Sequence, residues 1–481
     1  MSTRLPRFAF ALAALAFNFA VPSIAAVADS QPTSLTLTIL HDNDLHGHLL
    51  PFAYIEAGRK NVEEPSRGGA ARRATLIRRL RASINNPTFV VDSGDTTTRG
   101  PLTTTYEGIA DIEAMNAVGY DLGALGNNEF KLKDGVDAPD AAGAQAALLL
   151  FVKHSRFPWI CANAVDQKGA CLEGVEPYVI REFNGVRVGF LGLTAPRSAS
   201  YPQTKGWTIT DPVEAAKKWI PEARKHCDVL IAVTHIGVDL DKMVASQTSG
   251  LDAIVGGDSH TFLYTASEYS NAEGVKVPIV QDGEFGVDLG RFDLNLKKAT
   301  DGVWHLASYK YELVPVGPDI PEAVDVKAVL DPYVKPMLDV VGHIGPIAST
   351  PDGRTKQTVQ IVTDALRSEM VADFALSPGD AGFHEVFRHP DVTAYDVYAI
   401  LPFHDNAATA NLTGVQIQGL LKDHPDSVTS GDIAALDPAK TYKIAFLDYI
   451  ASGSYKLTAS QVVDSGLDVR TVVIDYLGKL H

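Results

Sequence analysis

Five short polar segments each follow directly on an apolar run of the kind that forms a β-strand. They carry Asp, His and Asn side chains and lie at residues 41–48, 92–95, 126–128, 234–235 and 257–260. Strand-like and helix-like stretches alternate along the same part of the chain, which favours an α/β or layered β fold. Because functional groups gather beyond the carboxyl ends of strands in open α/β sheets, the five segments predict one shared site.

The residue types in these segments are those that bind divalent metal ions. The candidate ligands are Asp44, His46, Asp95, Asn127, His235, Asp258 and His260. Asp44 and His46 are two residues apart, so on an extended backbone both can reach one ion. Each residue alone is more often a turn or surface residue, but five compatible groups at strand ends favour a metal site. Oxygen and imidazole ligands without thiolates suit Zn, Mn, Fe or Mg.

Composition limits the classes of protein to which this chain can belong. Its 481 residues are enough for two or three domains, and 46% hydrophobic with 21% charged residues is typical of a globular protein. The formal net charge of −16, without a basic run, argues against a nucleic-acid polymer as partner. We expect a monomer that acts on a small molecule.

The N-terminus has the pattern of a signal peptide covering residues 1–28. Arg4 and Arg7 precede an apolar stretch at residues 8–21, and Ala26-Val27-Ala28 fits a cleavage site. The stretch is too short to span a bilayer, and no charged face suggests an amphipathic anchor. We therefore expect an exported protein, periplasmic or extracellular, that is not inserted in a membrane.

The three cysteines leave two alternatives open. In an oxidising compartment Cys161 and Cys171 could pair across a short loop, which would leave Cys227 unpaired. Three free thiols are the other alternative.

The order and spacing of the polar segments resemble the calcineurin-like metallophosphoesterases, and among them the exported bacterial 5'-nucleotidases and 2',3'-cyclic phosphodiesterases. The resemblance is carried by residues 39–48, 68–72, 92–95, 119–127, 234–237 and 256–261. It implies an α+β protein with a four-layer α/β/β/α sandwich at 29–317. It further implies a linker helix at 318–345, where Pro321 begins an amphipathic stretch, and a C-terminal mixed α/β 5'-nucleotidase domain at 346–481.

The resemblance also implies two divalent ions and a reaction, the hydrolysis of nucleotides or related phosphate esters by metal-activated water. The first ion would be held by Asp44, His46, Asp95 and His260. The second would be held by Asp95, Asn127, His235 and Asp258.

Three positions depart from the family pattern. Asn128 replaces the His that stabilises the transition state and protonates the leaving group, and Lys131 replaces the Asp that orients this His. Such acid catalysis contributes about 10²–10⁴ in rate, so we expect altered or reduced activity. Lys131 either takes over the lost function or is simply solvated. Asp258 replaces a His, and this extra carboxylate should weaken binding of an anionic phosphate.

The C-terminal part departs from the family in its polar groups. Phe403 and Tyr449 lie where the family stacks two aromatic rings on a base, although ordinary core aromatics are the alternative. His384 replaces the Arg of a Gly-Gly-x-Arg phosphate-binding turn, and a second glycine-rich run is shortened at 453–454. A catalytically weak or inactive homologue that binds a nucleotide or another small ligand is therefore the alternative to an enzyme.

Overall fold

The computed structural model describes residues 32–55, 63–132, 141–379, 383 and 385–480. The predicted signal peptide and the predicted pocket residue His384 lie outside these ranges. Within them, no helix combines the length and the apolar character that crossing a membrane requires.

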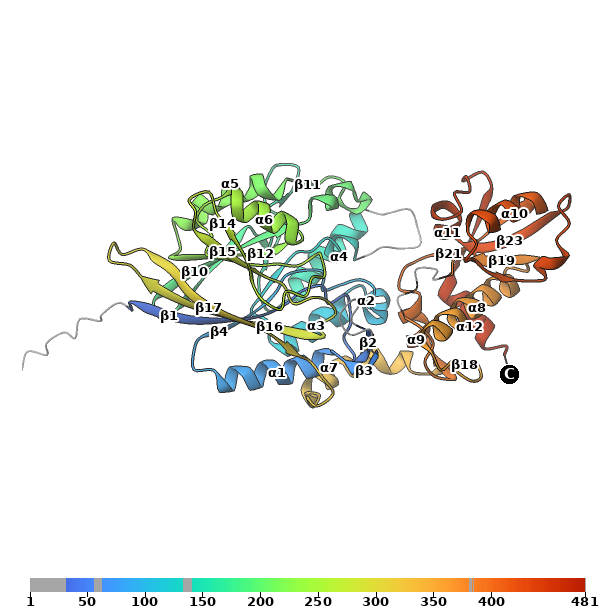
Figure 1. Ribbon diagram of the computed structural model, residues 1–481, viewed down its shortest axis with the longest axis horizontal. Coiled ribbons are helices and arrows are strands. Elements are labelled where there is room, and N and C mark those ends of the chain that lie inside the picture. Colours follow the sequence, from blue (N-terminus) through green and yellow to red (C-terminus); the bar gives the residue numbers. More distant parts are fainter. Residues whose placement is uncertain (1–31, 56–62, 133–140, 380–382, 384, 481) are drawn as a thin grey trace, which may run out of the picture.

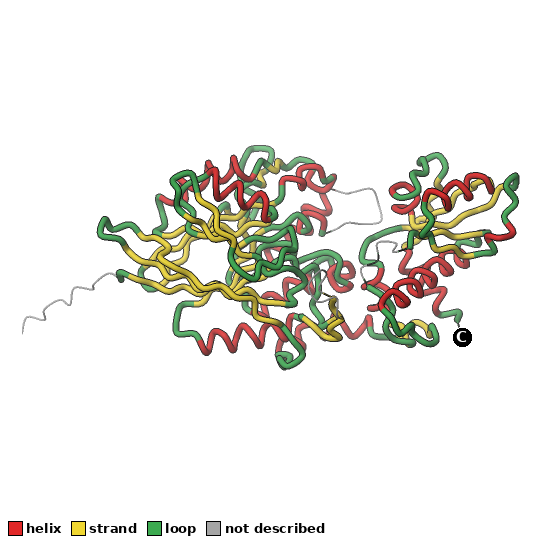
Figure 2. Tube along the Cα trace, in the orientation of Figure 1, coloured by secondary structure: helices red, strands yellow, loops and turns green. Residues whose placement is uncertain are grey.

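Two β-sheets form the centre of the N-terminal part (Figure 2). The first sheet contains, in spatial order, β17 (Trp304–Pro315), β16 (Asp288–Lys298), β1 (Ser34–Asp42), β4 (Thr88–Asp92), β5 (Leu122–Ala124), β6 (Trp159–Ile160) and β8 (Val175–Glu176). The second contains β14 (Ser267–Ser270), β15 (Lys276–Val280), β13 (Ala253–Val255), β12 (Val229–His235), β10 (Val186–Thr194) and β9 (Tyr178–Phe183). Side chains of both sheets share one buried core, in which the rings of Phe89 and Phe190 stack with centroids 4.7 Å apart.

Helices cover the outer face of each sheet (Figure 1). The first sheet packs against α1 (Ala70–Ser83), α3 (Ile109–Val118), α4 (Ala141–His154) and α7 (Val324–Val334), and the second against α5 (Pro212–Arg224) and α6 (Val238–Gln247). Strand β4 is buried on both faces. Phe89 and Val91 face the core between the sheets and Val90 faces the helices, which explains why the strand's sequence is continuously apolar. The predicted four-layer sandwich is confirmed.

The C-terminal part has its own sheet and its own core. The sheet contains β22 (Val428–Ser430), β19 (Phe374–Ser377), β23 (Thr441–Leu447), β21 (Asn406–Thr413) and β24 (Val462–Asp468). Its helices are α8 (Pro351–Glu369), α9 (Ala394–Ile400), α10 (Gly414–Asp423), α11 (Asp448–Gly453) and α12 (Val469–Leu477). Thr393 and Thr413 cap α9 and α10 through capping boxes. The α+β class predicted from the sequence is confirmed.

The segment predicted as a linker helix, residues 318–345, is helical over only part of its length. Helix α7 ends at Val334, and a short turn leads to β18 (Val340–His343), which pairs with β20 (Asp391–Thr393). Val326 and Leu330 of α7 are buried in the core of the N-terminal part. The helix is therefore a packed element of the first domain, and the chain enters the second domain as a strand.

Candidate metal centre

The carboxyl ends of five neighbouring strands deliver the predicted ligands to one place. β1 leads to Asp44 and His46, β4 to Asp95, β5 to Asn127, β12 ends at His235, and β13 leads to Asp258 and His260. Strands β1 and β4 run parallel with Asp42 opposite Asp92, so their following turns emerge side by side. The turns lie so close together that only glycine fits at position 126. A Cβ atom there would lie 2.3 Å from the backbone nitrogen of Asp95.

Most of the predicted ligands have a left-handed backbone conformation, which the sequence did not predict. The φ angles are 52° at Asp44, 46° at His46, 54° at Asp95, 83° at Asp258 and 52° at His260. Such conformations are costly for residues other than glycine and are concentrated at functional sites. The expectation that Asp44 and His46 share a face of an extended strand is wrong, because β1 ends at Asp42 and both residues lie in the loop that follows it.

Three imidazoles and two carboxylates converge at the centre of this site. His260 Nε2 lies 3.1 Å from Asp44 Oδ1 and 3.2 Å from His46 Nε2. His235 Nε2 lies 3.2 Å from Asp95 Oδ2, and His46 Nε2 lies 3.6 Å from Asp44 Oδ1. Asp44 Oδ1 and His235 Nε2 are buried and have no hydrogen-bond partner in the structure. Buried polar atoms of this kind suit a bound cation.

The far nitrogen of two of these imidazoles is held by the surrounding structure. His235 Nδ1 lies 2.8 Å from the carbonyl oxygen of Ser93, and His260 Nδ1 lies 2.5 Å from Glu284. Hydrogen bonds from Nδ1 to oxygen acceptors leave the lone pair of Nε2 pointing into the site, an arrangement typical of metal-binding histidines. Glu284 was not identified from the sequence, where no motif marks it.

The electrostatics of the cluster agree with a site for a cation. Burial alone would lower the pKa of His235, but Asp95 and Asp44 raise it well above its ordinary value. Burial would raise the pKa of Asp95, yet the charge of His235 lowers it to about 2. The carboxylates therefore hold protons on His235 and His260, whereas burial lowers the pKa of His46, and a metal ion that binds there must displace the protons of His235 and His260.

Asn127 and Asp258 are engaged by a residue that the sequence analysis missed. Arg197, on a 3-10 turn at Pro196–Ser200 after β10, donates from Nη1 to Asp258 Oδ2 at 2.8 Å. Its Nη2 donates to both Asp258 Oδ1 and Asn127 Oδ1. The two residues expected to complete the second ion's ligand set are thus already held by a guanidinium. No spacing or motif in the sequence indicated this arginine.

The segment after β5 organises Asp95. Asn128 donates from its backbone nitrogen to Asp95 Oδ1 at 2.8 Å and from Nδ2 to Asp95 Oδ2 at 2.6 Å. Glu129 accepts hydrogen bonds from the backbone nitrogens of Asp95 at 3.0 Å and Gly126 at 2.7 Å. Glu129 is adjacent to the predicted residues in the sequence, but the sequence did not indicate its role. In the structure it is completely buried and holds the backbone of Asp95 and Gly126 in place.

Three other predicted site residues, Lys131, Phe403 and Tyr449, lie outside the cluster. The ammonium group of Lys131 lies 4.2 Å from the centre of the Tyr201 ring. Phe403 and Tyr449 are 43% and 67% exposed, and neither is among the described residues that line the cavity between the two domains. The three cysteines, Cys161, Cys171 and Cys227, are free.

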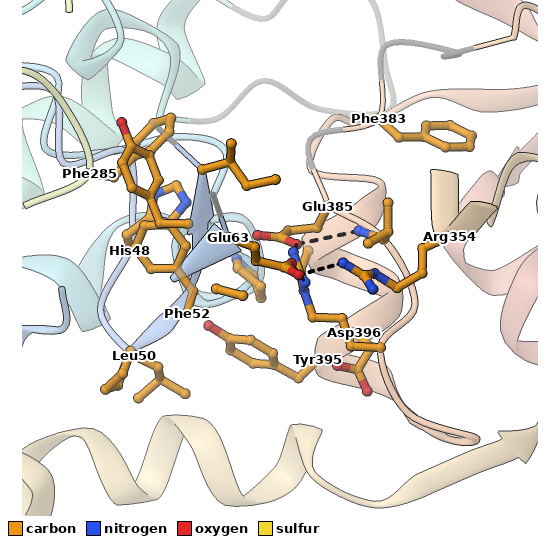
Figure 3. Close-up of a pocket in the computed structure, with 18 of the residues that line it drawn as sticks. His48, Leu50, Phe52, Glu63, Phe285, Arg354, Phe383, Glu385, Tyr395 and Asp396 are labelled. Carbon is orange, nitrogen blue, oxygen red and sulfur yellow. Dashed lines mark hydrogen bonds and ion pairs between the residues drawn. The ribbon is translucent and has the colours of Figure 1, made fainter. Parts of the chain in front are cut away.

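A cavity of about 550 Å³ lies between the two domains, next to the cluster (Figure 3). Glu284 and Phe285 belong to its wall, and the Phe285 ring lies 6.0 Å from that of His46, so the cavity and the cluster share a wall. His48 stacks on Phe285 with ring centroids 4.1 Å apart. On the opposite side, Figure 3 shows Arg354 reaching toward Glu63.

Glu63 joins the domains across this cavity. It lies on β3 (Glu63–Arg67), which pairs with β2 (Phe52–Ile55), and it bonds Arg354 at 2.5 Å and also Arg388. Arg388 in turn lies 3.2 Å from Glu385. The cavity wall therefore carries arginines whose charges are shared with carboxylates of both domains.

Comparison with known proteins agrees with this architecture. The family model "Calcineurin-like phosphoesterase" matches residues 37–262, and "5'-nucleotidase, C-terminal domain" matches residues 340–434. The trifunctional nucleotide phosphoesterase protein YfkN of Bacillus subtilis is 27% identical over 82% of this chain and 28% of its own length. The snake venom 5'-nucleotidase of Naja atra is 33% identical over 53% of this chain and 50% of its own length.

A solved structure is similar over nearly the whole chain. The 5'-nucleotidase precursor from Thermus thermophilus superimposes with a TM-score of 0.70 and 26% identity, covering 93% of this chain and 97% of that one. The chain spans half or less of the length of the two curated relatives above. A two-sheet sandwich with Asp and His side chains at the strand ends is the architecture of a metallophosphoesterase. The chain belongs to the calcineurin-like phosphoesterases that carry a 5'-nucleotidase C-terminal domain.

Calcineurin-like phosphoesterases bind divalent metal ions, and the residues of this chain fit one such ion well. Two groups bring candidate ligand atoms within 4.8 Å of one another: Asp44, His46 and His260, and Asp44, Asp95 and His235. Both groups contain Asp44. The fit of a second ion is poorer, because the oxygens of Asn127 and Asp258 accept hydrogen bonds from Arg197.

Proposed function

We propose that this chain is a metal-dependent phosphoric ester hydrolase that acts on nucleotides or related small phosphate esters. The observation that carries the proposal is the convergence of His46, His235 and His260 with Asp44 and Asp95 beside a cavity large enough for such a ligand. Cavities of this size typically enclose small molecules. Family membership supports the same reaction class.

The ion is one of Zn, Mn, Mg or Fe, since these bind mixed imidazole and carboxylate ligands. A bound divalent ion supplies Lewis-acid chemistry, activating water and neutralising phosphoryl charge. Of the two ions predicted from the sequence, the proposed activity requires the first, whose ligands converge. The oxygens expected to hold the second are already bonded to Arg197.

The residues of the cavity give it affinity for an anion with a flat group attached. Arg99 lines it and supplies positive charge, whereas Arg354 and Arg388 are bonded to Glu63; a guanidinium binds phosphate oxygens in pairs. His48 and Phe285 supply a stacked aromatic wall. An ester that lies in this cavity is next to the cluster, with Glu284 and Phe285 between them. Phe403 and Tyr449 remain proposed ligand-binding residues outside this wall, and His384 remains a proposed one that lies outside the described residues.

The environment of Asn128 supports altered or reduced activity. Its amide is bonded to Asp95, and an amide does not supply a proton to a leaving oxygen. Lys131 does not take its place in this structure, because its ammonium lies over Tyr201. Esters whose leaving groups need little protonation, such as aryl phosphates and cyclic phosphodiesters, are therefore the favoured substrates.

Metal analysis combined with a phosphate-release screen tests the proposal. The purified chain is loaded with each candidate ion and assayed on AMP, on 2',3'-cyclic nucleotides with a phosphatase present, and on aryl phosphates. We expect metal-dependent release that Asp95→Ala abolishes, while the distant control Arg187→Ala keeps it. A metal-loaded chain that releases phosphate from none of these esters contradicts the proposal.

A non-catalytic ligand-binding homologue is the second candidate. The contact between Asn128 and Asp95 favours it, because the side chain that stands in place of the family's acid is bonded to a metal ligand and does not donate a proton to a substrate. This candidate predicts ligand binding without turnover, and turnover restored by Asn128→His together with Lys131→Asp.

Export to the periplasm or the medium, and a monomeric state, complete the proposal. Export is supported by the signal-like pattern of residues 1–28. The domain limits predicted from the sequence are 29–317 and 346–481, with a connecting segment at 318–345. We propose that the boundary lies between α7, which packs in the first core, and β18, which pairs with β20.

A further inference from the structure

We infer that the guanidinium of Arg197 takes the place of the second metal ion, so that this centre holds one divalent ion and one arginine cation. The inference deepens the proposed function, because it specifies the cation content of the same site. It rests on three features of the described residues: the contacts of Arg197, the balance of charge, and the geometry of the remaining ligands.

The contacts place a cation between the two oxygens that a second ion would need. Arg197 Nη2 donates to both Asn127 Oδ1 and Asp258 Oδ1, and Nη1 holds the other oxygen of Asp258 at 2.8 Å. Asp258 is therefore bound in the bidentate manner that guanidinium and carboxylate groups favour. A metal ion that used these oxygens would compete with a charge-assisted pair for the same lone pairs.

The charges balance when Arg197 is counted. Asp44, Asp95 and Asp258 contribute three negative charges, which one divalent ion and one guanidinium neutralise. The substitution of Asp for the family's His at position 258 therefore does not leave an excess carboxylate. It creates a partner for Arg197, and the pair is well placed because Asp258 is almost buried while Arg197 is half exposed.

The remaining ligands form two groups that share Asp44: Asp44, His46 and His260, and Asp44, Asp95 and His235. His260 Nε2 and His235 Nε2 lie 3.1 Å and 3.8 Å from the same atom, Asp44 Oδ1, so the two groups meet at one carboxylate oxygen. The Oδ2 atom of Asp95, which would bridge two ions, accepts a hydrogen bond from Asn128 Nδ2 at 2.6 Å. A carboxylate oxygen engaged in this way is less available as a bridge, whereas one ion among the imidazoles needs no bridge.

The position of Arg197 is well defined by its surroundings. It follows β10, a strand of the second sheet that runs parallel to β12 with Thr194 opposite His235. Pro196 begins the 3-10 turn that carries it. Half of the side chain remains exposed, so the guanidinium can meet the phosphate of a bound ester while it holds Asp258.

Metal stoichiometry tests the inference directly. The purified chain is stripped of metal, titrated with Mn²⁺ or Zn²⁺, desalted, and analysed for metal per chain by mass spectrometry. We expect one tightly held ion in the wild type, and about twice that content in Arg197→Ala, where Asn127 and Asp258 become free to bind. The Mn²⁺-loaded wild type should give the electron paramagnetic resonance signal of an isolated ion, and the variant that of a coupled pair.

Arg187→Ala is the matched control. Arg187 is also half exposed and lies near the start of β10, at the opposite end of the strand from Arg197. It forms a bidentate pair with Asp228, at 2.9 Å and 3.1 Å. Its loss should leave the metal content unchanged. Arg197→Gln, which keeps a polar side chain without the charge, provides a second variant if the alanine variant is poorly folded.

Two outcomes overturn the inference. They are two tightly bound ions in the wild type, and an unchanged content in folded Arg197→Ala and Arg197→Gln. Both can be read without any enzymatic assay. Failure of phosphate release with one bound ion contradicts the proposed hydrolase and leaves the inference standing, so the two failures are distinguishable.

Discussion

The buried ion pair between Arg73 and Asp42 gives the sharpest test of how this fold supports its site. Arg73 lies on α1, and its Nε atom is 3.1 Å from Asp42 Oδ2 with both side chains excluded from water. Tyr120 donates its hydroxyl to the same carboxylate oxygen. Asp42 ends β1, two residues before Asp44, so the pair holds the strand end that begins the site.

Replacing Arg73 with Met should cost about 3–5 kcal/mol of the free energy of unfolding at pH 7, since Met keeps much of the side chain's volume but leaves a buried carboxylate uncompensated. Burial raises the pKa of Asp42, and Arg73 opposes this rise. Without Arg73 the carboxyl group avoids being buried as an anion by taking up a proton. This protonation lowers the free energy of unfolding by about 1.4 kcal/mol for each pH unit above the ordinary Asp pKa, or by about 4 kcal/mol at pH 7.

Urea denaturation followed by tryptophan fluorescence measures this cost in the relevant domain, because all four tryptophans, Trp159, Trp207, Trp219 and Trp304, precede the C-terminal domain. The sign of the pH effect follows from the raised pKa. The penalty of Arg73→Met should shrink by about 1.4 kcal/mol per unit as the pH falls toward 4, where the folded variant binds its proton without cost. Arg73→Met with Asp42→Asn should recover most of the loss at pH 7.

Two results would refute this reasoning. A penalty below about 1 kcal/mol at pH 7 would mean that the pair contributes no more than a surface ion pair. A penalty independent of pH, with no recovery in the double variant, would mean that lost packing rather than an uncompensated charge is the cause.

Three further predictions follow from other parts of the structure. Asn128→His with Lys131→Asp should raise the hydrolysis of esters with poor leaving groups by about 10²–10⁴ while aryl phosphates change little, and an equal change for both classes would contradict the missing-acid interpretation. Burial raises the pKa of Asp111 to about 7, so its contribution to stability is present below the ordinary Asp pKa and is lost as the pH rises to 7. Asp111→Asn should flatten the pH dependence of urea unfolding over that window, and an unchanged slope would show that Asp111 does not cause it. Glu63 is partly buried, which would raise its pKa, but the two arginines it bonds lower it. Its link between the domains should therefore persist at neutral pH and weaken as the pH falls through this lowered pKa. Glu63→Gln should increase proteolytic cleavage between the domains at pH 7, and the increase should shrink as the pH is lowered.

The fold class could be predicted because its signals are local in the sequence. Apolar strands that end in polar turns indicate a sheet with a site at its edge, and the parallel register of β1 with β4 places those turns together. The sequence could therefore identify the Asp and His residues that converge. It could not predict the left-handed backbone at Asp44, His46 or Asp95, because nothing in these residue types requires it and the surrounding turns impose it.

The residues that the sequence did not reveal are those that act through contacts between distant segments. Arg197 and Glu284 reach the cluster from loops that carry no motif, and both act on ligands many positions away in the chain. The helix predicted over 318–345 is shorter in the structure for a related reason. It covers only residues 324–334, and residues 340–343 form a strand because they pair with β20, a contact that the local sequence does not indicate.

The structure changes what the substitution at position 258 means for the reaction. From the sequence, a third carboxylate should weaken the binding of an anionic phosphate. In the structure Arg197 offsets the charge of Asp258, but one divalent ion and Arg197 together only balance the three carboxylates, so the centre keeps no net positive charge for a phosphate. Position 128 has no such compensation, because its amide is bonded to Asp95 and the ammonium of Lys131 lies over Tyr201. The lost acid should therefore lower kcat, most strongly for substrates with poor leaving groups, and the neutral centre should raise KM for anionic esters.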